Sequence, residues 1–409
     1  MDRPRGRLHY GWVVVACGSL VLFACLGLAR FAYGMLLPSM SADLALSYAD
    51  GGAIGTGYFV GYLAVVVAIP FLLGRVGSRV LVAAGLALIA ASLAGLSRGT
   101  GFWPVLALYT VTGVGSGMAN ITMVALISRW FAPSMRGRAA GIVLGGNGVG
   151  IILSGVLVPL LEDAGVGEVW RASWLILAGL TAGVALVAGT LLRNDPADLG
   201  LRPVGAGPLA AATAAKPAPS RAAERRLLVH LGLVYALFGA TYIIYGTFIV
   251  TTLVDAYRYP ADIAGTLWAW IGFLSIFSGA SFGALSDRIG RRGGLMAAFS
   301  VLTAAFLLAA LEPGEPLLYL SIGLFGIAAW SVPTIASAAA GDYLGPLRAA
   351  AGLSFITLFF AVGQVAGPLS AGALAEALGS FAPAYGLAAG LTALAVVLAA
   401  FLKPPAGNA

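Results

Sequence analysis

The feature that most constrains the fold is a series of apolar segments, each long enough to cross a membrane as a helix. The twelve segments are residues 10–38, 49–71, 80–97, 102–128, 139–161, 171–192, 228–254, 262–286, 294–311, 317–341, 349–374 and 381–402. Hydrophobic residues make up 60% of the chain and charged residues 10%, which excludes an ordinary soluble domain. No segment shows the polar–apolar alternation of a barrel strand. The sequence therefore predicts an all-α membrane protein with twelve transmembrane helices.

The distribution of charge predicts the orientation of these helices. If the N-terminus is cytoplasmic, most of the 23 Lys and Arg residues lie in inner loops, as in other membrane proteins with positive inner loops. The net charge of +7 therefore reflects topology and does not indicate nucleic-acid binding. The first apolar segment is too long for a cleavable signal peptide. We expect a multi-pass protein of the cytoplasmic (inner) membrane with both termini in the cytoplasm.

The chain divides into two similar halves. Residues 193–226 are rich in Pro and Ala and lack apolar periodicity, which is typical of a linker; we expect it to be mobile around 206–220. The predicted domains are a six-helix bundle at 1–192, this cytoplasmic linker, and a second six-helix bundle at 227–409. A shift of 213 positions superposes residues 70–79 on 283–292, Gly113 on Gly326 and Gly150 on Gly363. Two parallel six-helix halves are typical of transporters that work by alternating access.

The sequence GALSDRIGRR at 283–292 resembles the inner-loop signature of the major facilitator superfamily. The copy in the first half is degenerate, with Gly74 where the signature has Asp and Ser78 where it has a basic residue. The resemblance covers all twelve segments. It implies the major facilitator fold, with two pseudo-symmetric bundles, and a secondary transporter. It also implies that the protein is not an enzyme, and no phosphate-binding glycine loop, metal-ligand cluster or cofactor motif is evident.

Shorter motifs suggest a branch of this superfamily. YGWVVV at 10–15 and DPADLGLRPVG at 195–205 are similar to the bacterial branch near the monocarboxylate and oxalate/formate transporters. ARFAYGMLLP at 29–38 is also similar to a less characterised bacterial group. The sequence departs from the carboxylate carriers in the eighth segment, where Gly279 replaces an expected arginine, and in the eleventh, which lacks the lysine of oxalate carriers.

Arg30 is the one charged residue inside the first apolar segment. A guanidinium at this depth costs several kcal/mol unless it faces a cavity, a partner or the interface. All 16 acidic residues can be placed in loops or at helix ends, so no intramembrane partner is evident. Arg30 could face a central cavity and hold an anion by two parallel hydrogen bonds, or it could extend to the outer surface and pair with Asp43 or Asp50. Helical spacing places it on one stripe with Phe23, Gly27, Tyr33, Gly34 and Leu37, which favours the cavity.

Other candidate substrate-binding residues are polar or aromatic side chains within the segments. They are Tyr33, Asn120, Asn147, Tyr242, Tyr245, Trp330 and Gln364. The two tyrosines of the seventh segment correspond by the repeat shift to the neighbourhood of Arg30. The alternative for the amides is that they join helices, and for the aromatic residues that they lie at the membrane interface.

Charged residues of the inner loops are predicted to gate the transporter. They are Asp287, Arg288, Arg291, Arg292, Arg75, Arg79, Arg136 and Arg348. We expect Asp287 to dock on a helix N-terminus or on Arg348, and Arg75 and Arg79 to meet the turn at residues 136–138. The alternative is that these residues only determine topology.

Together these features predict a monomeric secondary active transporter that moves a small organic anion by alternating access. A monocarboxylate is the favoured substrate, and membrane lipid is the other partner. Proton coupling is left open, because no intramembrane carboxylate is available to titrate. Two alternatives remain at this point: an exporter of hydrophobic drugs or metabolites, and a non-transporting membrane solute receptor.

Overall fold

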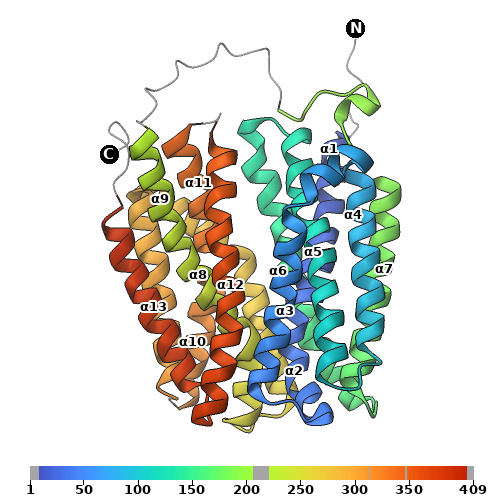
Figure 1. The fold of residues 1–409 in the computed structure, drawn as a ribbon, viewed down its shortest axis with the longest axis vertical. Coiled ribbons are helices and arrows are strands. Elements are labelled where there is room, and N and C mark those ends of the chain that lie inside the picture. The colour runs from blue at the N-terminus through green and yellow to red at the C-terminus, as the bar shows by residue number, and fades with distance from the viewer. Residues whose placement is uncertain (1–8, 206–220, 313, 346–347, 403–409) are drawn as a thin grey trace.

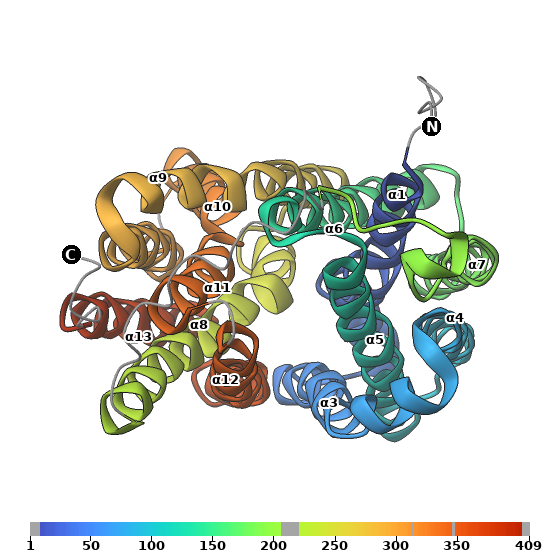
Figure 2. The same cartoon turned by 90° about the horizontal axis from the view of Figure 1, so that it is seen from above.

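The computed structural model describes residues 9–205, 221–312, 314–345 and 348–402. Within them the chain forms two bundles of helices that lie side by side (Figures 1 and 2). The N-terminal bundle consists of α1 (Tyr10–Leu22), the π-helix η1 (Phe23–Phe31), α2 (Ala32–Leu44), α3 (Tyr48–Val66), α4 (Ile69–Leu96), α5 (Phe102–Trp130), α6 (Pro133–Asp163) and α7 (Val169–Leu191). A short 3-10 helix, η2 (Pro196–Leu199), follows. The C-terminal bundle consists of α8 (Arg221–Asp255), α9 (Ala261–Ala310), α10 (Glu315–Ala328), α11 (Ser331–Leu344), α12 (Ala349–Leu378) and α13 (Ala382–Ala400).

Continuous and bent helices explain how these elements make twelve membrane crossings. Helices α1, η1 and α2 form one stretch of 35 residues, and ten such described stretches are long and apolar enough to span a membrane. The 50-residue α9 reverses direction at Gly290, where φ is 80°, so it contains two crossings. Helix α3 and the start of α4 form a further crossing that ends at a matching reversal at Gly77, where φ is 77°. Glycine adopts this left-handed conformation without steric cost. The predicted all-α fold of two six-helix bundles is confirmed.

The repeat of 213 positions is a structural repeat. Gly77 and Gly290 are separated by this interval and share nearly the same backbone angles. Gly150 of α6 packs directly against Gly27, and Gly363 of α12 packs against the backbone at Ala240. Gly27 and Ala240 are again 213 positions apart. Corresponding helices therefore meet at corresponding residues in the two bundles.

The segment that follows α7 packs against the N-terminal bundle. The Nε1 of Trp130 donates to the carbonyl oxygen of Arg193 at 3.1 Å, and its own carbonyl oxygen accepts from the Val204 amide at 2.8 Å. Helix α8 already begins at Arg221. The ordered structure therefore extends into both ends of the predicted linker. The part expected to be mobile, residues 206–220, lies outside the described residues.

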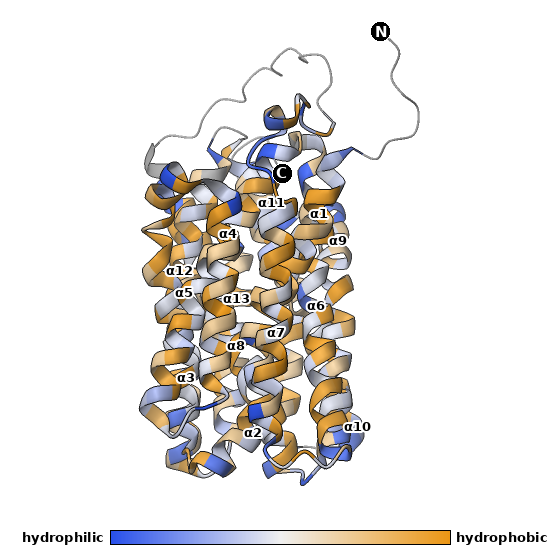
Figure 3. Ribbon diagram, turned by 90° about the vertical axis from the view of Figure 1, so that its right-hand side faces the viewer, coloured by the Kyte–Doolittle hydropathy of each residue, from blue (hydrophilic) through white to orange (hydrophobic). Residues whose placement is uncertain are grey.

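The two ends of the molecule are distinguished by the termini. We name the N-face as the end where α1 begins at Tyr10 and α13 ends at Ala400, and the distal face as the end where α2 ends at Leu44. Hydrophobic residues cover the helices between the two ends, and hydrophilic residues gather at the ends (Figure 3). This distribution is the one expected of a protein whose middle lies in a bilayer.

The bundles meet along two seams, α3 against α12 and α6 against α9 (Figure 2). Helix α2 also contacts α8 of the other bundle. Several hydrogen bonds cross from one bundle to the other, in the half of the molecule toward the distal face. They run from the Tyr48 hydroxyl to Asp255 (3.0 Å), from the Thr56 hydroxyl to the Val365 carbonyl oxygen (2.9 Å) and from Trp268 Nε1 to the Ser154 hydroxyl (3.0 Å). The seams are therefore closed toward the distal face.

Toward the N-face the seams open. Gly148 of α6 packs against Gly272 of α9, but one turn further toward the N-face Leu144 is 43% exposed. At the other seam, Gly52 and Gly55 of α3 contact Pro368 of α12, and the Thr56 hydroxyl donates to the Val365 carbonyl oxygen. All of these contacts lie in the distal halves of the two helices. The bundles thus diverge toward the N-face.

Candidate functional site

Arg30 lies in the π-helical stretch Phe23–Phe31. Such stretches are rare and occur frequently at functional sites. The wider turn changes the direction in which successive residues point, so the predicted single stripe is not formed. Gly27 contacts α6, Gly34 contacts α8, and Tyr33 stacks on a tyrosine of α5. Spacing along an ordinary α-helix could not show this separation.

The Arg30 guanidinium lies between the two bundles. Its central carbon is 5.1 Å from the ring centroid of Phe31, 4.6 Å from that of Phe59 and 5.4 Å from that of Tyr242. Cations within about 6 Å of an aromatic ring centroid are attracted to the ring. Phe31 and Phe59 belong to the N-terminal bundle and Tyr242 to the C-terminal bundle. Both bundles therefore contribute aromatic groups around one cation.

Two nitrogens of this guanidinium have no hydrogen-bond partner. The Nε and Nη2 atoms are buried, and neither finds an acceptor among the described residues. These two atoms form one edge of the guanidinium, which can hold a carboxylate by two parallel hydrogen bonds.

The predicted alternative partners of Arg30 are engaged elsewhere. Asp43 pairs with Arg171 at 3.2 Å, and Asp50 accepts from the Ser47 amide at 3.1 Å in the capping box that begins α3. The outer carboxylates therefore serve a loop contact and a helix cap.

Tyrosines of the N-terminal bundle hold the backbone around Arg30. The Tyr109 hydroxyl donates to the Arg30 carbonyl oxygen at 3.0 Å, and Tyr33 stacks on Tyr109 with ring centroids 4.6 Å apart. The Tyr33 hydroxyl donates to the Gly51 carbonyl oxygen at 2.7 Å, and the side chain is buried. Tyr33 thus supports the helix that carries Arg30, one layer away from the guanidinium.

The predicted residues of the C-terminal bundle include a group beside Arg30. Gln364 Nε2 donates to the Tyr242 hydroxyl at 2.5 Å. The Trp330 ring lies edge-on to Phe31, with centroids 5.5 Å apart, and 6.0 Å from the Tyr242 ring. Trp330 lies at the break between α10 and α11, three residues before Pro333, where proline removes a helical hydrogen bond. Tyr242, Gln364 and Trp330 are therefore brought together on one side of Arg30.

Three predicted residues have other surroundings. The Tyr245 hydroxyl shares a hydrogen bond of 2.8 Å with Ser321, and its ring stacks on Phe325 in the interior of the C-terminal bundle. Asn120 Nδ2 donates to the Tyr62 hydroxyl at 2.9 Å, which joins α5 to α3. Asn147 is 2% exposed, and its Oδ1 has no hydrogen-bond partner among the described residues.

Charged side chains at the N-face form an ion cluster in the C-terminal bundle. Arg291 pairs with Asp287 at 2.5 Å and with Asp342 of α11 at 2.6 Å. The predicted pairing of Asp287 with Arg348 is not formed, since the reversal at Gly290 brings Arg291 back beside Asp287. Arg348 pairs instead with Glu224 at 2.6 Å.

The corresponding loop of the N-terminal bundle has no such cluster among the described residues. The backbone amide of Arg79 donates to Asn194 Oδ1 at 2.8 Å. The Nε atom of the Arg79 side chain donates to the Gly189 carbonyl oxygen at 2.5 Å. Arg136 donates to the Phe131 carbonyl oxygen at 2.9 Å. These arginines therefore bind backbone and the segment after α7, in place of the predicted contact between the two loops. The remaining predicted gating residues, Arg75, Arg288 and Arg292, are exposed.

Sequence reasoning missed some residues of these groups. Phe59 contacts the Arg30 guanidinium, but a phenylalanine in an apolar segment carries no signal that separates it from one facing lipid. Asp342 pairs with Arg291 but is not among the predicted gating residues. The sequence does carry an indication of a special role for Asp342. Position 342 corresponds by the repeat shift to Arg129, so a basic residue in one half is replaced by an acidic residue in the other.

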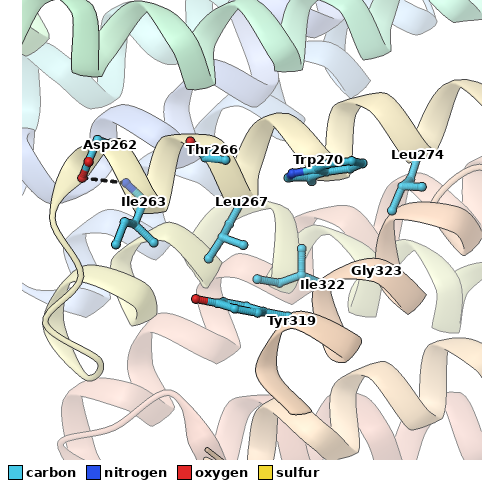
Figure 4. A pocket seen from close by; sticks show the side chains of 9 residues that line it. All are labelled: Asp262, Ile263, Thr266, Leu267, Trp270, Leu274, Tyr319, Ile322 and Gly323. Atoms are coloured by element: carbon cyan, nitrogen blue, oxygen red, sulfur yellow. Dashed lines mark hydrogen bonds between the residues drawn. The ribbon is translucent and has the colours of Figure 1, made fainter. Parts of the chain in front are cut away.

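Two surface grooves lie apart from these residues. One, of about 510 Å³, lies between α9 and α10; Figure 4 shows its lining residues, among them Trp270 and Tyr319. The other, of about 470 Å³, lies between α6 and α9 and shares Asp262, Thr266 and Trp270 with the first. Trp270 and Tyr319 are 52% and 42% exposed, so these grooves face outward. Neither includes a predicted site residue.

Two six-helix bundles related by a repeat, closed at one face and open at the other around a buried charge, define the class: a membrane transporter with the major facilitator fold. The family model described as "Uncharacterised MFS-type transporter YbfB" matches residues 22–400. The chain therefore belongs to this family of the major facilitator superfamily. The narrower resemblance to carboxylate carriers stays a prediction.

Known relatives are similar over different shares of the chain. A "Hexuronate transporter" of Bacillus subtilis is 23% identical over 93% of this chain and 92% of its own. A "Probable anion transporter 4, chloroplastic" of Arabidopsis thaliana is 29% identical over 40% of this chain and 33% of its own. A "Putative metabolite transport protein" of Haemophilus influenzae is 31% identical over 41% of this chain and 40% of its own. The chain thus matches less than half of the length of the last two relatives.

Solved structures share the fold. The nucleoside transporter NupG has a TM-score of 0.72 at 15% identity, over 96% of this chain and 98% of that chain. A bacterial homologue of the human lysosomal transporter Spinster, in an inward-facing and unoccupied conformation, has a TM-score of 0.70 at 18% identity, over 97% and 95%. At these identities the likeness establishes the fold alone.

Proposed function

We propose that the protein is a secondary active transporter that carries a small organic anion, a monocarboxylate, across the cytoplasmic membrane by alternating access. The observation that carries this proposal is the buried Nε–Nη2 edge of Arg30, which has no acceptor among the described residues. A buried guanidinium edge is costly when it is left unpaired. A carboxylate is the group that matches its geometry.

The surroundings of Arg30 favour one negative charge on the substrate. Aromatic rings of both bundles surround the guanidinium. A dicarboxylate would therefore leave one charge among apolar groups, which is unfavourable. The printed names of two relatives, an anion transporter and a hexuronate transporter, support an anionic substrate.

The arrangement of the seams supports alternating access. The bundles are closed toward the distal face and diverge toward the N-face, so a solute at Arg30 would exchange with the N-face. The distribution of Lys and Arg supports a cytoplasmic N-face. In the opposite state the α3–α12 and α6–α9 seams would open at the distal face, and the Tyr48–Asp255 hydrogen bond would break.

The test combines binding and transport on the purified full chain. A panel of monocarboxylates is screened by thermal shift, because a ligand that binds the folded protein raises its unfolding temperature; hits are tested for counterflow in proteoliposomes. We expect stabilisation and counterflow for the native protein, loss of both for Arg30→Gln, and no change for Arg98→Gln, whose side chain is exposed.

Other outcomes would contradict the proposal in different ways. Equal stabilisation of Arg30→Gln would remove Arg30 from the site. Binding without counterflow would favour the solute receptor. Counterflow of apolar cations that is independent of Arg30 would favour the exporter of hydrophobic compounds.

A further inference from the structure

Asn147 faces the space between the two bundles. Successive residues of an α-helix differ in direction by about 100°. On α6, Gly146 and Gly150 contact α1 and η1 of their own bundle, and Gly148 contacts α9 of the other bundle. Val149, on the opposite side from Asn147, is 49% exposed. Asn147 therefore points between two faces of α6, the face that contacts α1 and η1 and the face that contacts α9, and away from the outer surface.

A second contact confirms this direction. Ser154 lies two turns from Asn147 on the same face of α6, and its hydroxyl accepts a hydrogen bond of 3.0 Å from Trp268 Nε1 of the other bundle. Leu144, one turn toward the N-face, is 43% exposed. Asn147 thus lies just inside the point at which the α6–α9 seam opens.

The side chain of Asn147 carries an unused hydrogen-bonding atom. The residue is 2% exposed, and Oδ1 has no partner among the described residues. An amide that joins two helices uses its polar atoms for that purpose, as Asn120 does with Tyr62. The unsatisfied Oδ1 of Asn147 serves no such contact, and leaving a buried acceptor unpaired costs free energy.

Asn147 and Arg30 are close in height along the bundle. Gly150 packs against Gly27; Arg30 follows Gly27 by three residues toward the distal face, and Asn147 precedes Gly150 by three toward the N-face. At a rise of about 1.5 Å per residue in an α-helix, and less in the wider turn of the π-helical stretch, the two α-carbons differ in height by no more than roughly 9 Å. One small solute with hydrogen bonds of about 2.8 Å at either end can span this height.

We propose that Asn147 is a specificity-determining residue and that the substrate is a hydroxylated monocarboxylate. The carboxylate binds the Nε–Nη2 edge of Arg30, the hydroxyl group donates to Asn147 Oδ1, and the body of the solute lies against the aromatic rings between them. This inference rests on the proposed function and deepens it. It assigns Asn147 a direct contact with the solute, in place of a packing role among the glycines of α6.

The test uses matched pairs of carboxylates on the purified full chain. Binding of benzoate, 4-hydroxybenzoate and 4-methoxybenzoate, and of propanoate and 3-hydroxypropanoate, is measured by titration calorimetry. We expect a hydroxylated member to bind about tenfold more tightly than its unhydroxylated or methylated counterpart. Asn147→Leu is expected to abolish this preference while retaining the weaker binding. Thr181→Val is expected to keep the preference, because Thr181 is buried on α7 and its hydroxyl donates to the Leu177 carbonyl oxygen of the same helix.

Each contrary outcome has a distinct meaning. If no pair shows a preference, or if Asn147→Leu retains it, the inference is overturned while Arg30-dependent binding still supports the proposed function. If no carboxylate binds, or if Arg30→Gln binds all of them normally, the proposed function fails and the inference fails with it. Asn147→Ser, a smaller change, replaces the leucine variant if that variant does not fold.

Discussion

The guanidinium carbon of Arg30 lies 5.4 Å from the ring centroid of Tyr242, and the two residues belong to different bundles. The contact joins a helix that begins the first bundle to the helix that begins the second. Tyr242 in turn accepts a hydrogen bond from Gln364, so the position of its ring is set by α12. A charge of one bundle is thus stabilised by a ring that the other bundle holds in place.

The hydrogen bond between Gln364 and Tyr242 gives a test of this arrangement. Tyr242→Phe keeps the ring but leaves the buried Gln364 amide without its acceptor, so we expect the free energy of unfolding to fall by about 1–3 kcal/mol. Gln364→Leu in the same chain removes the unpaired amide and should recover most of the loss. Unfolding in detergent measures both. A double variant no more stable than Tyr242→Phe would contradict the contact.

Substitution of Arg30 by lysine separates charge from geometry. Lysine keeps the positive charge but presents a point charge without the two-donor edge. We therefore expect carboxylate affinity to fall by about tenfold or more, and Arg98→Lys to bind normally. Calorimetric titration with a carboxylate hit measures the effect. Unchanged affinity in Arg30→Lys would mean that only the charge matters.

Closure toward the distal face depends on a close approach of two glycines. A Cβ atom at Gly34 would collide with the carbonyl oxygen of Gly246 in the other bundle, so Gly34→Leu should push the bundles apart there and favour the opposite state. In a chain without Cys17 and Cys25, a cysteine at Leu144 reports on the opening at the N-face. We expect slower maleimide labelling of Leu144→Cys when Gly34→Leu is added.

The control for this experiment is Gly179→Leu. Position 179 lies on α7, and a Cβ atom there meets nothing within 4 Å. Gly179→Leu therefore adds the same side chain as Gly34→Leu but does not touch the other bundle. Labelling equally slow in both variants, or unaffected by Gly34→Leu, would show that the glycine contact does not control the closure.

The ion cluster at the N-face is expected to tie α9 to α11. Asp342→Asn removes the charge that pairs with Arg291 at 2.6 Å. Because these groups are partly exposed, we expect a loss of up to about 1 kcal/mol in the free energy of unfolding, smaller at high salt. Denaturation at two ionic strengths measures it, with Glu168→Gln, whose exposed side chain pairs with Arg171 at the distal face, as the control. A loss that does not change with salt would contradict an electrostatic role.

Much of the architecture could be predicted because it follows from local properties. Apolar segments of membrane-spanning length predict the helices, and the repeat of 213 positions predicts two similar bundles. Arg30 could be identified because one charge in an apolar segment has few acceptable environments. Each of these signals lies within one segment, or in the comparison of two.

The composition of the site could not be predicted in the same way. The ring of Phe59 on α3 meets the Arg30 guanidinium of η1, and Tyr245 turns into its bundle while Tyr242 faces the other. Two tyrosines on one helix look alike in sequence, and the neighbours of each decide its role. Likewise the π-helical stretch separated residues that ordinary helical spacing had placed on one face.

The sequence by itself determined that this chain crosses the membrane twelve times in two related halves, and that it carries one charge at depth. These properties depend on hydrophobicity and on internal similarity, which can be read along the chain without knowing where its residues lie in space. The tertiary structure alone decided that Asp43 and Asp50 are engaged elsewhere, that aromatic rings of both bundles surround Arg30, and that Asn147 faces the space between them. These relationships depend on the packing of distant segments, since a side chain's partners are set by how whole helices meet.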